Sequence, residues 1–136
     1  MFMRFVFFVF VVLGLNASAW AASVKDGIFT QTQADRGQPV ILDWCAHCHS
    51  PTLLGGENDT PPLVGNVFLD KWKGKTLGEL FEKMRTTMPV DDPGKLSRTE
   101  YLFALAYILR ANNFPVGAKP LPSDAKSLEQ IEVVAP

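Results

Sequence analysis

Apolar residues recur at helical spacing in two stretches of the chain, and each stretch begins with a capping signal. Residues 77–87 carry apolar side chains at every third or fourth position and follow the tetrapeptide Thr76-Leu77-Gly78-Glu79. In such a capping box the first and last side chains each accept a hydrogen bond from the other residue's backbone N–H. The pattern predicts a helix from 77 to about 87. Pro89 disfavours helix at the residue before it, so we expect Met88 in an extended loop just beyond the helix end.

The second stretch with helical spacing follows another capping box, Ser97-Arg98-Thr99-Glu100. Asn112-Asn113 and Pro115 end the pattern, as expected for residues that stop helices. The apolar stripe between these two signals consists of Leu102, Leu105, Ala106 and Leu109. We therefore predict a helix across this stretch.

A further helix is expected earlier in the chain, from about 33 to 47, with Thr32 and Asp35 as its capping signal. Pro39 is awkward inside it, because an interior proline lacks a backbone N–H and clashes with the preceding turn. Either the helix starts near Gln38 or it is kinked, and the residues alone leave both options open.

The remaining segments lack clear helical spacing. Residues 22–31 form a polar lead-in, and residues 50–75 are rich in Gly, Asn-Asp and Pro-Pro pairs, which are typical of loops. A loop of about 25 residues is long for a compact domain, so we expect a bound group to organise it. Residues 114–136 are proline-rich and are expected to form an extended surface tail, with a short helix at 123–131 as an option. The apolar residues available to line a pocket in the loop are Leu63, Val64, Val67, Phe68 and Leu69.

The chain begins with the pattern of an export signal. Arg4 precedes an apolar run from Phe5 to Leu15, and Ala19-Trp20-Ala21 offers small residues at the positions a signal peptidase reads. The apolar run is shorter than the roughly 20 residues of a membrane span. We predict a signal peptide over residues 1–21. Cleavage two residues earlier and an uncleaved anchor are the alternatives.

Removal of the signal would leave residues 22–136, enough for one small domain with its core at about 32–113. One of the 13 basic residues lies in the signal, so 12 basic residues face 14 acidic ones and nothing indicates nucleic-acid binding. So short a domain has a thin hydrophobic core, which a large apolar prosthetic group would enlarge. We expect a periplasmic or secreted protein with no membrane span in the mature chain.

The pentapeptide Cys45-Ala46-His47-Cys48-His49 has the spacing of a c-type haem attachment site. Residues three apart lie on one face of a helical turn, so both sulfurs can bond to the vinyl groups of one porphyrin. The imidazole of His49 can then reach the iron as proximal ligand. The motif predicts one covalently attached haem c.

Three other interpretations of the motif remain. Cys45 and Cys48 could be an ordinary structural or redox pair. With Trp44 in front of it, the motif also resembles a thioredoxin-like active site, in which Cys45 would be the nucleophile of a thiol–disulfide oxidoreductase, but that site needs a βαβ unit. Zinc is the weakest interpretation, because one compact turn cannot surround a metal with four ligands.

A haem held by His49 needs a ligand on its other face. His47 lies inside the attachment turn and cannot reach that face, which leaves Met84 and Met88 beyond the signal peptide. Met84 belongs to a helical apolar stripe and is expected in the core, so we predict Met88 as the second axial ligand; an open or Lys-ligated iron is the other option. Two axial ligands leave no site for substrate, which indicates an electron carrier rather than an enzyme.

The order of these motifs resembles class I cytochrome c, and in particular the small periplasmic cytochromes that partner PQQ-dependent alcohol dehydrogenases of bacteria. The likeness covers about residues 29–122. It is carried by Gln33-Ala34-x-Arg36-Gly37, Cys45–His49, Leu54-x-Gly56, Pro61-Pro62-Leu63-x-Gly65, Phe68, Trp72, Leu80-Phe81, Thr86-Thr87-Met88-Pro89, Pro93-Gly94-x-Leu96-Ser97 and Ala106-Tyr107-Ile108-Leu109.

The resemblance implies an all-α fold with about three main helices and long loops wrapped around one haem. It implies that Cys45 and Cys48 form the thioethers and that His49 and Met88 are the axial ligands. The resemblance also implies an electron carrier between redox proteins, such as a PQQ-dependent dehydrogenase and a terminal oxidase. The remaining roles that it implies are a carbonyl of Pro62 that holds His49, haem contacts of Leu63 and Trp72, and a close crossing of the first and last helices at Gly37 near Tyr107. Ser50 and Pro39 depart from the family pattern without touching a ligand.

Overall fold

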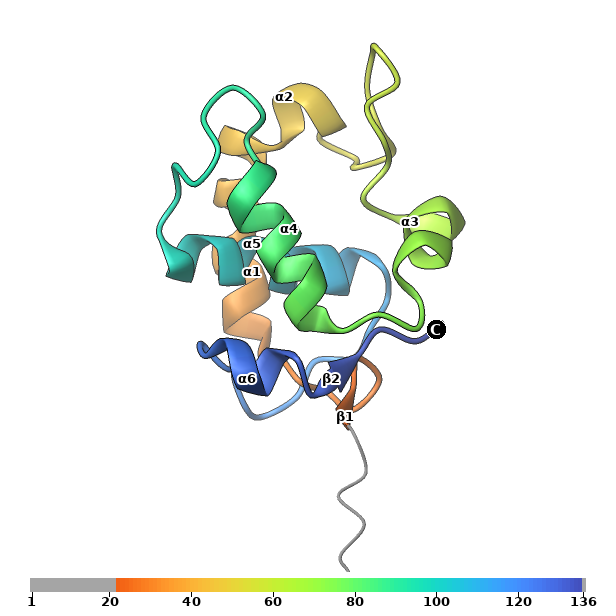
Figure 1. The fold of residues 1–136 in the computed structure, drawn as a ribbon, viewed down its shortest axis with the longest axis vertical. Coiled ribbons are helices and arrows are strands. Elements are labelled where there is room, and N and C mark those ends of the chain that lie inside the picture. Colours follow the sequence, from red (N-terminus) through yellow and green to blue (C-terminus); the bar gives the residue numbers. More distant parts are fainter. Residues whose placement is uncertain (1–21, 136) are drawn as a thin grey trace, which may run out of the picture.

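The computed structural model describes residues 22–135, and the predicted signal peptide at 1–21 lies outside the described residues. The described part is mainly helical, which confirms the all-α prediction (Figure 1). None of its helices is long and apolar enough to cross a membrane. Its elements are β1 (Ala22–Ser23), α1 (Gln31–Trp44), α2 (Ala46–His49), α3 (Gly65–Trp72), α4 (Leu77–Thr87), α5 (Arg98–Ala111), α6 (Ala125–Leu128) and β2 (Ile131–Glu132).

Helices α4 and α5 begin and end close to where the sequence pattern predicts. Thr76 and Ser97 are the N-caps, and each forms a complete capping box with the glutamate three residues later. Met88 follows α4 in an extended conformation, with φ −125° and ψ 147°, as Pro89 led us to expect. These predictions are confirmed. The sequence could specify both helices because the two partners of each signal lie within a few residues of one another.

Helix α1 starts earlier than predicted. Its N-cap is Thr30, not Thr32: the Thr30 hydroxyl accepts the N–H of Gln33 at 3.1 Å, and the Gln33 side chain accepts the N–H of Thr30 at 3.2 Å. The sequence prediction relied on an acidic residue in the first turn, whereas a glutamine completes this box. Pro39 lies inside the helix, which excludes a start near Gln38.

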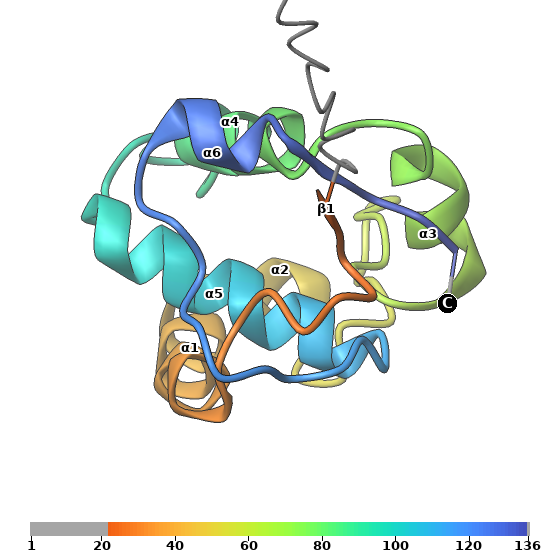
Figure 2. The ribbon, with the colours of Figure 1, turned by 90° about the horizontal axis from the view of Figure 1, so that it is seen from below.

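Helices α1 and α5 cross with their backbones close together, and Figure 2 shows α1 nearly end-on beside α5. A Cβ atom on Gly37 would lie 2.0 Å from the carbonyl oxygen of Phe103 and 2.8 Å from Cβ of Tyr107. Only a glycine permits this approach, which confirms the expected crossing.

The segment 50–75 is not wholly loop, since it contains the eight-residue helix α3. Phe68 is 3% and Trp72 is 7% exposed, so one face of α3 belongs to the core. The sequence pattern does not reveal this helix, because its N-cap, Val64, makes no side-chain capping bond and the helix has few turns over which a period can show.

Both chain ends are buried more deeply than expected. In the supposed polar lead-in, Val24 and Phe29 are 0% exposed. The supposed surface tail buries Leu121, Leu128 and Val133, and its strand β2 pairs in parallel with β1. The expectation of a surface tail was wrong because the prolines only prevent a long helix; they do not keep the apolar residues between them out of the core.

Candidate functional site

The predicted ligand residues face one cavity of about 800 Å³. Cys45, Cys48, His49 and Met88 all line it, although they come from the α1–α2 region and from the end of α4. A volume of this size is in the range of ligand and cofactor sites. An open groove of about 520 Å³ between residues 22–28 and 117–122 has no His, Cys or Met in its wall.

The attachment motif forms a tight turn that starts where α1 ends. The N–H of Cys45 donates to the Ile41 carbonyl at 2.9 Å, and the N–H groups of Cys48 and His49 both donate to the Cys45 carbonyl, at 3.2 and 2.9 Å. The two cysteines are not joined by a disulfide bond. Two thiols one turn apart on the wall of one cavity, followed by an imidazole, are the donor set that covalent haem attachment requires.

His49 is 7% exposed, and its Nδ1 lies 2.8 Å from the carbonyl oxygen of Pro61. A carbonyl can only accept, so Nδ1 carries the proton and Nε2 keeps its lone pair free for a metal. This contact corrects the expectation that Pro62 would hold the ring. Two prolines lie side by side, successive carbonyls of an extended chain point in different directions, and the fold turns that of Pro61 toward His49. Pro62 and Leu63 do line the cavity.

Met88 lines the same cavity from just beyond the C-terminal end of α4. Its N–H donates to the Met84 carbonyl at 3.0 Å, and its own carbonyl accepts the hydroxyl proton of Tyr101 at 2.6 Å. Met84, which the sequence analysis assigned to the core, is partly buried and lines the same cavity as Met88. Both methionines of the described chain therefore line the cavity, and both are candidates for the second ligand.

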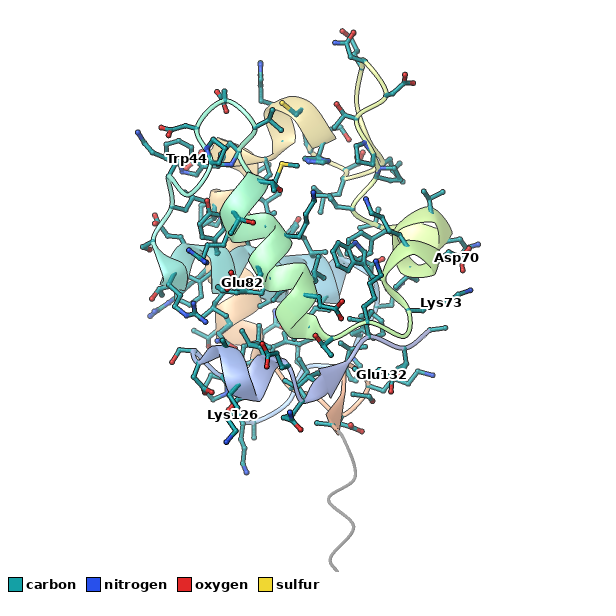
Figure 3. All side chains as sticks on the ribbon, viewed as in Figure 1. Trp44, Asp70, Lys73, Glu82, Lys126 and Glu132 are labelled. Atoms are coloured by element: carbon teal, nitrogen blue, oxygen red, sulfur yellow. The ribbon has the colours of Figure 1, made fainter. Side chains whose placement is uncertain are left out.

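Helix α3 and the residues just after it contribute apolar surface and cations. Trp72 lines the cavity as expected, and Lys71 and Lys75 place their Nζ atoms 6.0 and 5.2 Å from the centre of its ring. Lys73, just after α3, pairs with Asp70 at 2.7 Å, and both side chains lie on the outer side of α3 (Figure 3). Of the five apolar residues proposed to line the pocket, Leu63, Val67 and Phe68 do so. Leu69 is buried in the core, and Val64 is partly buried and packs against the core.

Two residues that shape the site were not predicted from the sequence: Tyr101 lines the cavity, and Asn112 holds the loop beside it. Tyr101 was given no role at the site, and Asn112 was recognised only as a helix-stop signal. The Asn112 amide is 3% exposed and donates to the carbonyls of Leu63 and Ile108 at 2.9 and 2.8 Å, while its oxygen accepts the N–H of Gly65 at 3.0 Å. It thereby fixes the chain just after Pro61. No local pattern indicates this role, because Leu63 is 49 residues away along the chain.

The cysteine environment argues against thiol–disulfide chemistry. Burial, with a smaller contribution from the neighbouring Cys48 thiol, raises the pKa of Cys45 to about 11. A nucleophilic cysteine needs a lowered pKa, because the thiolate is the reactive form. The described strands are also only two residues long, so the described residues lack the βαβ unit of a thioredoxin-like site.

A comparison with protein families matches residues 32–108 to the family described as cytochrome C oxidase, cbb3-type, subunit III. The matched stretch runs from α1 into α5 and contains the attachment turn and Met88. The chain belongs to this family. It is a c-type cytochrome.

Among solved structures, the cytochrome is similar to a chain of the sulfane dehydrogenase SoxCD from Paracoccus pantotrophus, with 20% sequence identity and a TM-score of 0.51. The alignment covers 83% of this cytochrome and 60% of that chain. At this identity the likeness concerns the fold alone. None of the curated proteins compared with the cytochrome matches it.

Family membership implies covalently bound haem c and electron transfer rather than catalysis. The haem supplies an iron that alternates between two oxidation states, and the protein supplies its ligands and surroundings. The cavity and its donor residues fit such a group.

Proposed function

We propose that this cytochrome is a periplasmic monohaem electron carrier that accepts electrons one at a time from a quinoprotein dehydrogenase and passes them on toward a terminal oxidase. In this proposal Cys45 and Cys48 form the thioethers, and His49 and Met88 are the axial ligands. The observation that carries the proposal is that all four side chains line a single cavity, though Met88 lies about forty residues further along the chain than the attachment turn.

The surrounding residues have definite tasks in this proposal. Pro61 holds the His49 ring by its Nδ1–H and leaves Nε2 for the iron. Leu63 and Trp72 provide apolar cavity wall that excludes water from the porphyrin. With two axial positions filled by protein atoms, the iron has no position for a substrate, which is the arrangement expected of a carrier.

The first test compares the two methionines that line the cavity. Met88→Ala is expected to abolish the methionine-to-iron charge-transfer band of the oxidised protein and to lower the reduction potential, because a nitrogen or oxygen ligand then replaces the thioether. Met84→Ala is the matched control and should keep the band. Loss of the band in Met84→Ala, with retention in Met88→Ala, would reverse the ligand assignment.

The competing thiol–disulfide function is tested on the same preparation. A haem attached by thioethers gives a coloured band on a denaturing gel and leaves no titratable thiols, whereas an oxidoreductase gives a colourless band with two thiols after reduction. A colourless, stably folded protein from a host that matures c-type cytochromes would refute the proposal.

The partner is tested by mixing the oxidised cytochrome with a periplasmic quinoprotein alcohol dehydrogenase and its substrate, and following haem reduction in a stopped-flow instrument. An observed reduction rate that rises linearly with dehydrogenase concentration supports a diffusing carrier. Co-purification of the two proteins through several columns would instead identify the cytochrome as a bound electron-entry subunit. Failure to be reduced would exclude this class of donor and leave the haem assignment intact.

A further inference from the structure

A buried tyrosine of α5 contacts the backbone of the proposed methionine ligand. Tyr101 is the fourth residue of α5 and is 2% exposed, and its side chain lines the same cavity as Met88 and His49. A buried tyrosine hydroxyl needs a hydrogen-bond partner. Here that partner is the Met88 carbonyl, at 2.6 Å, which is a short O–H···O contact.

Without this hydrogen bond the Met88 carbonyl would be poorly held. The only other donor to it among the described residues is the N–H of Gly94, at 3.4 Å, which is too long for a strong hydrogen bond. On the other side of the residue, the Met88 N–H is bonded to the last turn of α4. Beyond Met88 the chain enters an exposed loop that includes Val90, which is 73% exposed. The hydrogen bond from Tyr101 is therefore what connects the ligand residue to α5.

We infer that Tyr101 is a positioning residue that keeps the Met88 thioether on the iron. The inference rests on the proposed function, because it needs a haem with Met88 as ligand. A methionine side chain is flexible, so the ligand stays in place only if its backbone is held. Helix α4 fixes the N–H of Met88 and helix α5 fixes its carbonyl. An external ligand that displaces the thioether must compete with this pre-organised arrangement.

The test is a titration of the oxidised holoprotein with imidazole, following loss of the methionine-to-iron band. In Tyr101→Phe the ring still fills its site, but the hydroxyl is gone. A net hydrogen bond of about 0.5–1.5 kcal/mol corresponds to imidazole binding that is roughly 2- to 12-fold tighter than in the unmodified protein. Tyr107→Phe is the matched control: it makes the same change on the same helix, at a half-buried ring that contacts Arg110 and is not part of the cavity wall. Its affinity for imidazole should equal that of the unmodified protein.

The outcomes separate this inference from the proposed function. If Met88→Ala removes the band but Tyr101→Phe binds imidazole like the unmodified protein, the positioning role is refuted and the ligand assignment stands. If Met88→Ala keeps the band, the ligand assignment fails and the role of Tyr101 fails with it. A purely structural tyrosine would lower the thermal midpoint of Tyr101→Phe without changing its affinity for imidazole.

A second variant and a variant-free measurement support the test. Tyr101→Leu should bind imidazole at least as tightly as Tyr101→Phe. If only Tyr101→Leu binds imidazole more tightly than the unmodified protein, and Tyr101→Phe does not, the effect belongs to the ring and the hydroxyl role is refuted. In the reduced unmodified protein, the buried hydroxyl proton should exchange slowly enough to be seen by NMR. A rapidly exchanging hydroxyl would also overturn the inference.

Discussion

Replacement of Asn112 by alanine should destabilise the cytochrome more than any surface substitution of the same kind. The amide makes three hydrogen bonds at 2.8–3.0 Å and is almost completely buried. Each is worth about 1 kcal/mol net, and a buried group left without a partner costs more. Gly65 is exposed, so water can replace its lost acceptor, whereas the Leu63 carbonyl lies in a half-buried loop. We therefore expect a loss of about 2–3 kcal/mol in the free energy of unfolding. This loss corresponds to a fall of roughly 10 °C or more in the midpoint of thermal unfolding.

The assay is urea unfolding of the holoprotein at constant pH, followed by far-ultraviolet circular dichroism. Asn66→Ala is the matched control, because Asn66 is an exposed residue of α3 and its replacement should change the free energy of unfolding by less than about 0.5 kcal/mol. Hydrogen exchange offers a local measurement. The Leu63 N–H, bonded to the Leu53 carbonyl at 2.8 Å, should exchange faster in Asn112→Ala, because that segment loses its tie to α5.

Asn112→Asp replaces the amide NH₂ group by a second oxygen. The aspartate keeps an oxygen for the Gly65 N–H but, when ionised, presents negative charge to the carbonyls of Leu63 and Ile108. This variant should therefore be less stable at neutral pH than at pH values where the carboxyl is protonated and can donate. Two results would refute the proposal that the Asn112 amide holds residues 63–65 in place. One is a loss below about 1 kcal/mol in the free energy of unfolding of Asn112→Ala, and the other is a stability of Asn112→Asp that does not depend on pH.

Three further predictions concern the helix crossing, the attachment turn and acid stability. Gly37→Ala should lower the free energy of unfolding by about 1–3 kcal/mol despite the better helix propensity of alanine, because its Cβ would lie 2.0 Å from the Phe103 carbonyl oxygen; chemical denaturation would measure this, and an unchanged midpoint would contradict the close crossing. Gly56→Ala should destabilise the protein by a similar amount, because its Cβ would lie 1.9 Å from the carbonyl oxygen of Cys48. The attachment turn would then be disturbed, and the yield of protein with covalently bound haem should be lower than for an alanine variant at an exposed site. Hydrogen bonds from the Ser97 side chain and backbone lower the pKa of Glu100 from its ordinary value of 4.5, so its stabilising effect is present above that pH and is lost as the pH falls through the folded-state value. Urea unfolding at a series of acidic pH values should show a smaller loss of stability for Glu100→Gln than for the unmodified protein, and equal losses would exclude a role for this carboxyl.

The sequence alone was sufficient wherever the interacting groups are close together along the chain. Both glutamate capping boxes join residues three apart, and the attachment motif spans one turn. The extended conformation of Met88 follows from the proline next to it. These features depend on local backbone geometry, so their residue types and spacing specify them. The close crossing at Gly37 was expected only through resemblance to a family, since nothing near Gly37 reveals its partner.

Only the tertiary structure decided which distant groups meet. The choice between the Pro61 and Pro62 carbonyls for His49 depends on how the loop returns to the attachment turn, 12 residues away along the chain. The burial of the two chain ends arises from packing against residues far away in the sequence. The contacts of Asn112 with the loop at residues 63–65, and of Tyr101 with Met88, likewise join separate elements. A hydrogen-bonding side chain has the same appearance in a sequence whether it faces solvent or a buried carbonyl, and the fold alone determines which partner it finds.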